Sequence, residues 1–294
     1  MISTRTRRLL HLTGSGLGII GIVFVITRLV AYRDQLPLLD LPAMSWIELA
    51  CLTAAYGICG SILALAWRQL LGWHGVRVAR AWSVRAYGTS QLAKYIPGNI
   101  FHLAGRQAMG VAAGMPAWPF AKSIGWELAT ISGTAVLFVP LAFPLKLPAV
   151  GFFVSVASFA AVLALTWGLL RRFVSPHVAS AVAWYAVFLS AAGLIFCALL
   201  MLISLSHASA LNCPTMWGCV GGAYVLAWLA GLVTPGAPAG VGVREAVLYW
   251  LLRDVTGHAE LITAILLGRA VTVGGDLLFF LGAILVRPTH SLSA

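Results

Sequence analysis

Long apolar runs that recur along the chain constrain this sequence more than any other feature. A helix needs about 20 consecutive apolar residues to cross roughly 30 Å of hydrocarbon. Runs of this kind lie at residues 9–31, 46–71, 120–140, 148–170, 183–205, 216–233 and 261–286. They predict an all-α integral membrane protein with seven or eight transmembrane helices, in a single polytopic domain over residues 1–294.

The composition agrees with this prediction, because 61% of the residues are hydrophobic and only 9% are charged. Soluble domains carry about a quarter charged residues. The formal net charge is +11, but the arginines separate apolar runs instead of forming a continuous basic face. Such a distribution indicates topology signals and contacts with lipid phosphates, and it argues against a nucleic-acid partner.

Basic residues also predict the orientation of the chain. The first eight residues include three arginines, and the connector after the run at 46–71 is rich in arginine between residues 68 and 85. Because positive loops stay in the cytoplasm, we expect the N-terminus and this connector to face inward. Seven crossings would put the C-terminus outside, whereas an eighth would keep Arg287 inside, as the same rule prefers.

Two stretches, at about residues 86–114 and 234–254, are too polar and too broken to cross as regular helices. The residues that make the breaks are Pro97, Gly98, Pro235, Gly236, Gly240 and Gly242. A Pro-Gly pair precedes an arginine by the same interval in both stretches, from Pro97 to Arg106 and from Pro235 to Arg244. We interpret them as re-entrant segments of an inverted repeat, a pattern that points to a transporter's binding site. The alternative is two cytoplasmic loops that share Pro-Gly by chance.

Ionisable side chains near or inside the apolar runs are the candidates for a binding site. Each would cost roughly 2.5 to 3.5 kcal/mol at a helix centre, so each should face a partner or a wet cavity. We expect Arg106 and Arg244 to bind a phosphate together with free backbone amides at the breaks. Glu127 and Glu245 would hold these arginines, or a cationic or hydroxyl-bearing head. A position near the lipid headgroups is the alternative for Glu127.

Further polar residues extend this candidate site. Lys94, Asn99 and His102 add hydrogen-bond donors at the first break, and a satisfied interior histidine is the alternative for His102. Arg269 and Asp276 are secondary polar candidates. They share one helix face two turns apart, so we expect each to pair with another helix and not with each other.

The sequence gives no sign of catalysis. It shows no nucleophile with its base, no paired carboxylates and no His or Cys spacing typical of a metal site. A nucleotide-binding motif is also missing. We therefore expect a protein that is not an enzyme and that uses neither a cofactor nor a metal, so its transport would be passive or coupled to an ion gradient.

Two motifs give the chain a family resemblance. Residues 93–98 read Ala-Lys-Tyr-Ile-Pro-Gly and are followed by Gly105-Arg106, and residues 240–245 read Gly-Val-Gly-Val-Arg-Glu. In this order they resemble the transmembrane domain of the lysylphosphatidylglycerol synthase/flippase family, with Val241 where leucine is common. The resemblance implies lipid movement between leaflets. Some members of the family also carry a cytosolic aminoacyl-transfer domain, for which this chain has no counterpart.

The motifs and the resemblance together predict a lipid translocase that moves a phospholipid or a polyprenyl-phosphate-linked glycolipid through a polar groove. Its partners would be membrane lipids with anionic headgroups, and a lipid-modifying enzyme or glycosyltransferase. The expected location is the cytoplasmic membrane of a bacterium or archaeon. Three alternatives stay open: a secondary transporter of a small anionic solute, a membrane partner of a lipid-modifying enzyme, and a membrane-embedded transferase.

Overall fold

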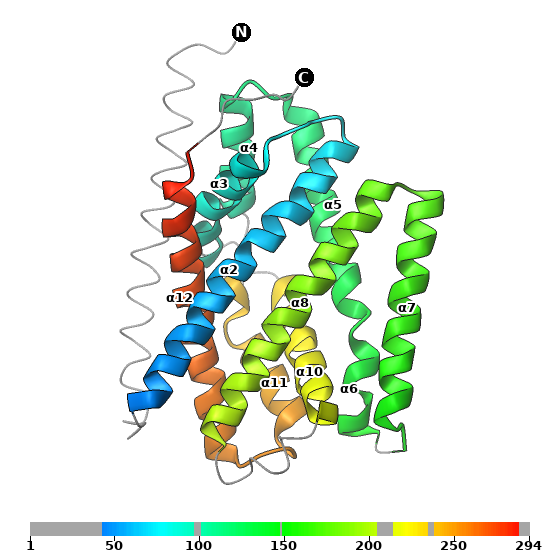
Figure 1. Cartoon of the computed structure of the whole chain (residues 1–294), viewed down its shortest axis with the longest axis vertical. Helices are drawn as coiled ribbons and strands as arrows, with labels where there is room; N and C mark the ends of the chain where they lie inside the picture. Colours follow the sequence, from blue (N-terminus) through cyan, green and yellow to red (C-terminus); the bar gives the residue numbers. More distant parts are fainter. Residues whose placement is uncertain (1–42, 97–100, 148, 205–213, 235–237, 288–294) are drawn as a thin grey trace.

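The computed structural model describes residues 43–96, 101–147, 149–204, 214–234 and 238–287, and these residues form helices and no strands. The helices vary widely in length, and short ones lie between long ones (Figure 1). In chain order they are α2 (Ala43–Trp73), α3 (Arg80–Gln91), η1 (Leu92–Tyr95), α4 (Phe101–Ala112), α5 (Ala117–Val136), α6 (Val139–Lys146), α7 (Phe152–Phe173), α8 (Pro176–Ile203), α10 (Pro214–Val233), η3 (Pro238–Gly240), α11 (Val243–Leu252) and α12 (His258–Leu285).

Six helical segments within the described residues are long and apolar enough to cross a membrane. They are Met44–Trp73, Ala117–Lys146, Phe152–Phe173, Pro176–Ile203, Thr215–Val233 and His258–Leu285. Each coincides with one of the apolar runs predicted from the sequence, which defines the chain as an all-α, multi-pass membrane protein. The predicted run at residues 9–31 lies outside the described residues.

The first broken stretch folds as a helical hairpin, here called hairpin A, made of α3, η1 and α4. The two helices α3 and α4 pack against each other, and η1 forms the described part of the tip. The helix gives way to extended backbone at Ile96, whose φ is −71° and ψ is 133°. This conformation is the one expected for the residue before a proline, because the ring of Pro97 disfavours helical geometry there.

The second broken stretch forms hairpin B, made of α10, η3 and α11. Glycine is required at its tip, because Gly240 has a φ of +73° and Gly242 a φ of +88°. The backbone also approaches α10 closely, so that a Cβ atom added to Gly240 would lie 2.6 Å from the Cα atom of Gly231. The tip of hairpin B is thus held against its own first helix.

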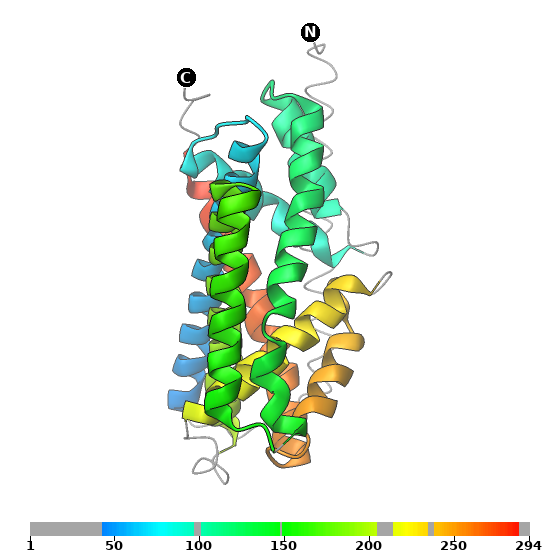
Figure 2. The same cartoon turned by 90° about the vertical axis from the view of Figure 1, so that its right-hand side faces the viewer.

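The two hairpins lie in opposite halves of the molecule, and their tips meet. Hairpin A occupies the end where α2 finishes, and hairpin B occupies the end where α12 begins (Figures 1 and 2). Leu92 and Tyr95 of η1 pack against Ala239 of η3 and against Val273 of α12. The break predicted at Pro97 and Gly98, and the one at Pro235 and Gly236, lie just outside the described residues.

A crossing of α2 and α12 beside these tips depends on glycine. A Cβ atom at Gly275 would lie 2.8 Å from Cδ1 of Tyr56 and 2.9 Å from the backbone nitrogen of Gly57. We expect Gly275→Val to destabilise the protein by about 1–3 kcal/mol, because overpacking forces such helices apart. Thermal unfolding in detergent would measure this loss of stability, and Gly282→Ala is the control on the same helix. A Cβ atom at Gly282 has no neighbour within 4 Å, and a stability loss equal to that of Gly275→Val would contradict the packing argument.

Candidate functional site

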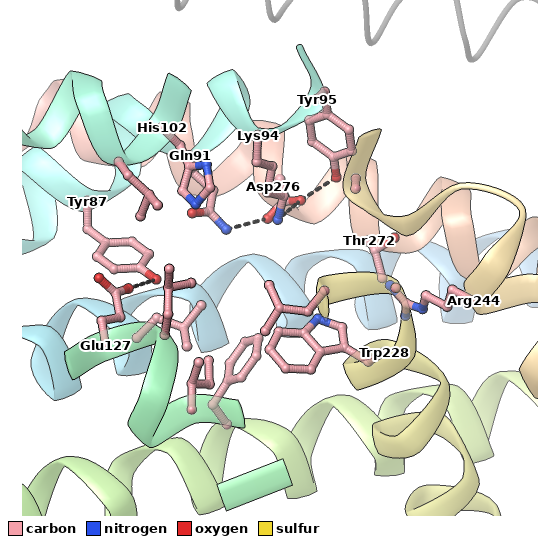
Figure 3. A pocket seen from close by; sticks show the side chains of 18 of the residues that line it. Tyr87, Gln91, Lys94, Tyr95, His102, Glu127, Trp228, Arg244, Thr272 and Asp276 are labelled. Atoms are coloured by element: carbon pink, nitrogen blue, oxygen red, sulfur yellow. Dashed lines mark hydrogen bonds and ion pairs between the residues drawn. The ribbon is translucent and has the colours of Figure 1, made fainter. Parts of the chain in front are cut away.

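A cavity of about 100 Å³ lies between the tips of the two hairpins and is bordered by α2, α5, α8 and α12 (Figure 3). Its polar wall comes from both hairpins and from three long helices. The polar residues are Tyr56, Tyr87, Gln91, Lys94, Tyr95, His102, Glu127, Arg244, Arg269, Thr272 and Asp276. The cavity has room for several water molecules or a small ionic group.

The other wall of the cavity is apolar and reaches the surface of the molecule. It is formed by Leu63, Leu103, Leu128, Ile131, Phe188, Trp228 and Leu232. Leu128 on α5 both lines the cavity and is 39% exposed. The cavity therefore borders the outer face of α5, a helix apolar enough to lie in a membrane.

Asp276 on α12 anchors the tip of hairpin A. Its carboxylate lies 2.7 Å from the ammonium of Lys94 and accepts hydrogen bonds from the hydroxyl of Tyr95 and the amide of Gln91, the latter at 3.3 Å. Figure 3 shows these three side chains converging on the carboxylate. Because the Asp276 side chain is only 4% exposed, its charge depends on Lys94 for compensation.

Arg106 is enclosed behind the polar wall and does not line the cavity. It is 1% exposed, and its Nη1 atom lies 3.0 Å and 2.8 Å from the two carboxylate oxygens of Glu127. The guanidinium is stacked over the rings of Tyr87, at 4.2 Å, and Trp67, at 5.0 Å. The Tyr87 hydroxyl donates to the same carboxylate at 2.8 Å. The charge of Arg106 is therefore compensated by Glu127, although its Nε atom lacks a hydrogen-bond partner among the described residues.

An ion pair also joins hairpin B to α12, but here the hairpin supplies the carboxylate and α12 supplies the cation. Glu245 on α11 accepts from Arg269 on α12, and it also accepts from the backbone N–H of Gly242 at 2.5 Å. Arg269 donates in addition to the carbonyl oxygen of Ala239 at 3.0 Å. Its Nη2 atom is buried and lacks a hydrogen-bond partner in the described part of the chain. This donor of Arg269 is thus unsatisfied by the described protein groups.

Arg244, at the start of α11, lines the cavity and is 8% exposed. Its guanidinium lies over the ring of Tyr224 at 4.5 Å. Across the described ranges, Arg244 has no carboxylate within the 4.0 Å of an ion pair, whereas Lys94, Arg106 and Arg269 each have one. A buried guanidinium of this kind is a ready partner for an anion.

Most of the site residues predicted from the sequence gather around this one cavity. Those that line it are Lys94, His102, Glu127, Arg244, Arg269 and Asp276. As expected, Arg269 and Asp276 pair with other elements and not with each other. Glu245 lies behind Arg269, Gly240 and Gly242 form the tip of hairpin B, and Asn99 lies outside the described residues.

Three tyrosines that line the cavity or lie behind its wall were not predicted from the sequence. Tyr87 and Tyr224 each stack on the arginine of their own hairpin, and Tyr95 binds Asp276. A signal was present, because Tyr87 precedes Arg106 by nearly the interval at which Tyr224 precedes Arg244.

No family model, curated protein or solved structure matches this chain. The family resemblance drawn from the two motifs therefore stays a prediction. Within the described ranges, no three His, Cys, Asp or Glu side chains come together in a way that could hold a metal ion.

Proposed function

We propose that this protein is a lipid translocase that moves lipids with an acidic phosphate head between the leaflets of a bacterial or archaeal cytoplasmic membrane. One observation carries the proposal: Arg244 is a buried cation that lines a cavity and has no carboxylate partner within the described residues. A buried charge without a counter-ion is costly, and a bound phosphate would compensate it. The family resemblance of the two motifs supports the same function.

The two walls of the cavity suit the two parts of a lipid. The phosphate would bind Arg244 and the remaining donor of Arg269, while the tails stay beside the apolar wall that reaches the surface at Leu128. An unpaired anion in a medium of low dielectric costs tens of kcal/mol in the idealised limit. A polar site halfway along the path lowers that barrier, and the tails need not leave the hydrocarbon.

The same proposal takes the hairpins as re-entrant parts of an inverted repeat. The packing of α3 on α2 and α12 corresponds to the packing of α10 on α8 and α5. Each hairpin also carries a related cluster, in which a tyrosine packs against both an arginine and an aromatic ring of the preceding long helix. The clusters are Trp67, Tyr87 and Arg106 in one half, and Phe196, Tyr224 and Arg244 in the other.

An inverted repeat gives a physical route for transport. Two related halves can exchange conformations around a fixed central site, so that the site opens first to one leaflet and then to the other. With α10 assigned to hairpin B, the other five candidate spans and the predicted run at residues 9–31 make six crossings beside the two re-entrant hairpins, and the N-terminus lies in the cytoplasm.

Lipid movement in proteoliposomes tests the proposal. The purified protein is reconstituted with fluorescent phosphatidylglycerol, and the fraction accessible to a membrane-impermeant quencher is followed in time. We expect the wild-type protein to accelerate exchange, and we expect Arg244→Gln to slow it at least about tenfold, since a charged partner is removed from a buried site. Arg253→Gln is the matched control, because Arg253 is an exposed arginine just after the same helix.

The outcomes separate the alternatives. Equal rates for the wild type and Arg244→Gln would contradict the assignment of the site. If the protein instead carries inorganic phosphate into sealed vesicles without moving lipid, it is a transporter of small anions. If it only copurifies with a lipid-modifying enzyme and moves neither, it is a partner of that enzyme.

A further inference from the structure

We infer that the cavity selects lipids whose head is a phosphodiester with a single net negative charge. This inference rests on the proposed function, because it takes the cavity as the lipid site. It comes from the charges that the two hairpins and their neighbouring helices bring together. Those charges leave an excess of one positive charge among the described residues.

Three ion pairs account for all but one of the charges at the cavity and its walls. The pairs are Lys94 with Asp276, Arg106 with Glu127, and Arg269 with Glu245. Arg244 is the remaining cation. His102 also lines the cavity and is counted as neutral, as an ordinary imidazole is at pH 7.

The excess charge arises from a difference between the two halves. In the first half, α5 supplies Glu127 to the hairpin arginine Arg106. In the second half, the corresponding helix α12 supplies a cation, Arg269, which pairs with the hairpin carboxylate Glu245. The arginine in the position equivalent to Arg106 is Arg244, and it is left without a carboxylate. The positive charge is therefore localised at the start of α11.

The net charge of a lipid headgroup should then determine how strongly it binds in the cavity. A phosphodiester with one negative charge makes the occupied site neutral, and its two free oxygens match the planar fork of a guanidinium. A zwitterionic head leaves the charge of Arg244 unbalanced, and a dianionic phosphate monoester leaves a negative charge. A cationic head, such as that of an aminoacylated lipid, adds a second positive charge. An uncompensated charge is costly in a buried site, so each mismatch weakens binding.

Two substitutions shift this balance in opposite directions. Arg244→Gln removes the excess charge, so we expect the preference for an anionic lipid over a zwitterionic one to be lost. Glu245→Gln frees the charge of Arg269, while the amide oxygen can still accept from Gly242 N–H. We expect this variant to prefer a dianionic head, because the site then carries an excess of two positive charges.

Native mass spectrometry of the purified protein measures the preference without any transport. The protein is placed in nanodiscs that contain equal amounts of phosphatidylglycerol, phosphatidylcholine, phosphatidic acid and a cationic lipid, and the retained lipid is identified. We expect the wild type to retain phosphatidylglycerol about tenfold or more over phosphatidylcholine, and the cationic lipid least of all. Arg244→Gln should retain the first two equally, and Glu245→Gln should retain phosphatidic acid most.

Control variants show whether a change in lipid preference comes from the cavity, and a second cavity variant covers the case in which the first does not fold. Arg253→Gln and Glu48→Gln remove one charge of each sign from exposed positions and should retain the wild-type preference. Arg244→Lys should keep it too. If Arg244→Gln does not fold, Glu245→Gln decides the question. An unchanged preference in the folded variants overturns the inference even if lipid exchange is fast. The predicted shifts without any lipid exchange by the wild type would uphold charge selection and overturn the proposed translocase.

Discussion

Glu127→Ala is expected to destabilise the protein by about 3–5 kcal/mol, because it leaves the guanidinium of Arg106 buried without its counter-ion. Arg106 is 1% exposed and packs between the rings of Trp67 and Tyr87. The chain cannot easily turn this side chain out to water. We expect a large fall in the yield of monodisperse protein and in the midpoint of thermal unfolding.

The double variant Arg106→Met with Glu127→Leu is the control for this prediction. Replacing both members of a buried ion pair by apolar residues of similar size is often neutral or stabilising, so most of the lost stability should return. Tyr87 loses its acceptor in this variant, but it lines the cavity, where water can replace the carboxylate. A double variant as unstable as Glu127→Ala would contradict the ion-pair explanation.

The same double variant tests whether Arg106 contacts the lipid. The sequence predicts both hairpin arginines as phosphate ligands, yet Arg106 is enclosed and only Arg244 lines the cavity. We expect the double variant to exchange lipid at close to the wild-type rate. If it folds but loses exchange, as Arg244→Gln is expected to do, then Arg106 also serves the lipid.

Much of the fold could be predicted from the sequence because its signals are local. An apolar run of bilayer length predicts a helix that crosses, and six of the predicted runs coincide with such helices. A Pro-Gly pair predicts a break, and the equal interval to Arg106 and Arg244 predicts that the two breaks are related. Each of these signals depends on residues close together in the chain.

The partners of the charged residues could not be predicted in this way. Arg106 and Arg244 follow the same pattern, but their surroundings depend on whether the next long helix brings Glu127 or Arg269 to the hairpin. The contacts of Gln91 and Tyr95 with Asp276 likewise depend on how the tip of hairpin A docks on α12. These pairings depend on how distant helices pack together, so hydropathy and residue spacing do not determine them.

Asp276→Asn should release the tip of hairpin A from α12. The substitution removes the charge that Lys94 faces and places an amide among groups that donate to the carboxylate. Breaking a buried pair by removing one partner costs about 3–5 kcal/mol. We therefore expect amide hydrogen exchange at residues 92–96 to become at least about a hundredfold faster, if the tip opens locally.

The ion pair of Lys146 with Asp254 provides a matched control, because its nitrogen and oxygen are also 2.7 Å apart. The two pairs differ in burial, since the side chain of Asp254 is 64% exposed and that of Asp276 is 4% exposed. Exposed pairs contribute about 0–1 kcal/mol, so Asp254→Asn should leave exchange near its own position almost unchanged. If both substitutions had equally small effects, Asp276 would not hold hairpin A. If only Asp276→Asn frees residues 92–96, then burial, and not the distance between the charges, determines how firmly the carboxylate holds the hairpin beside the cavity.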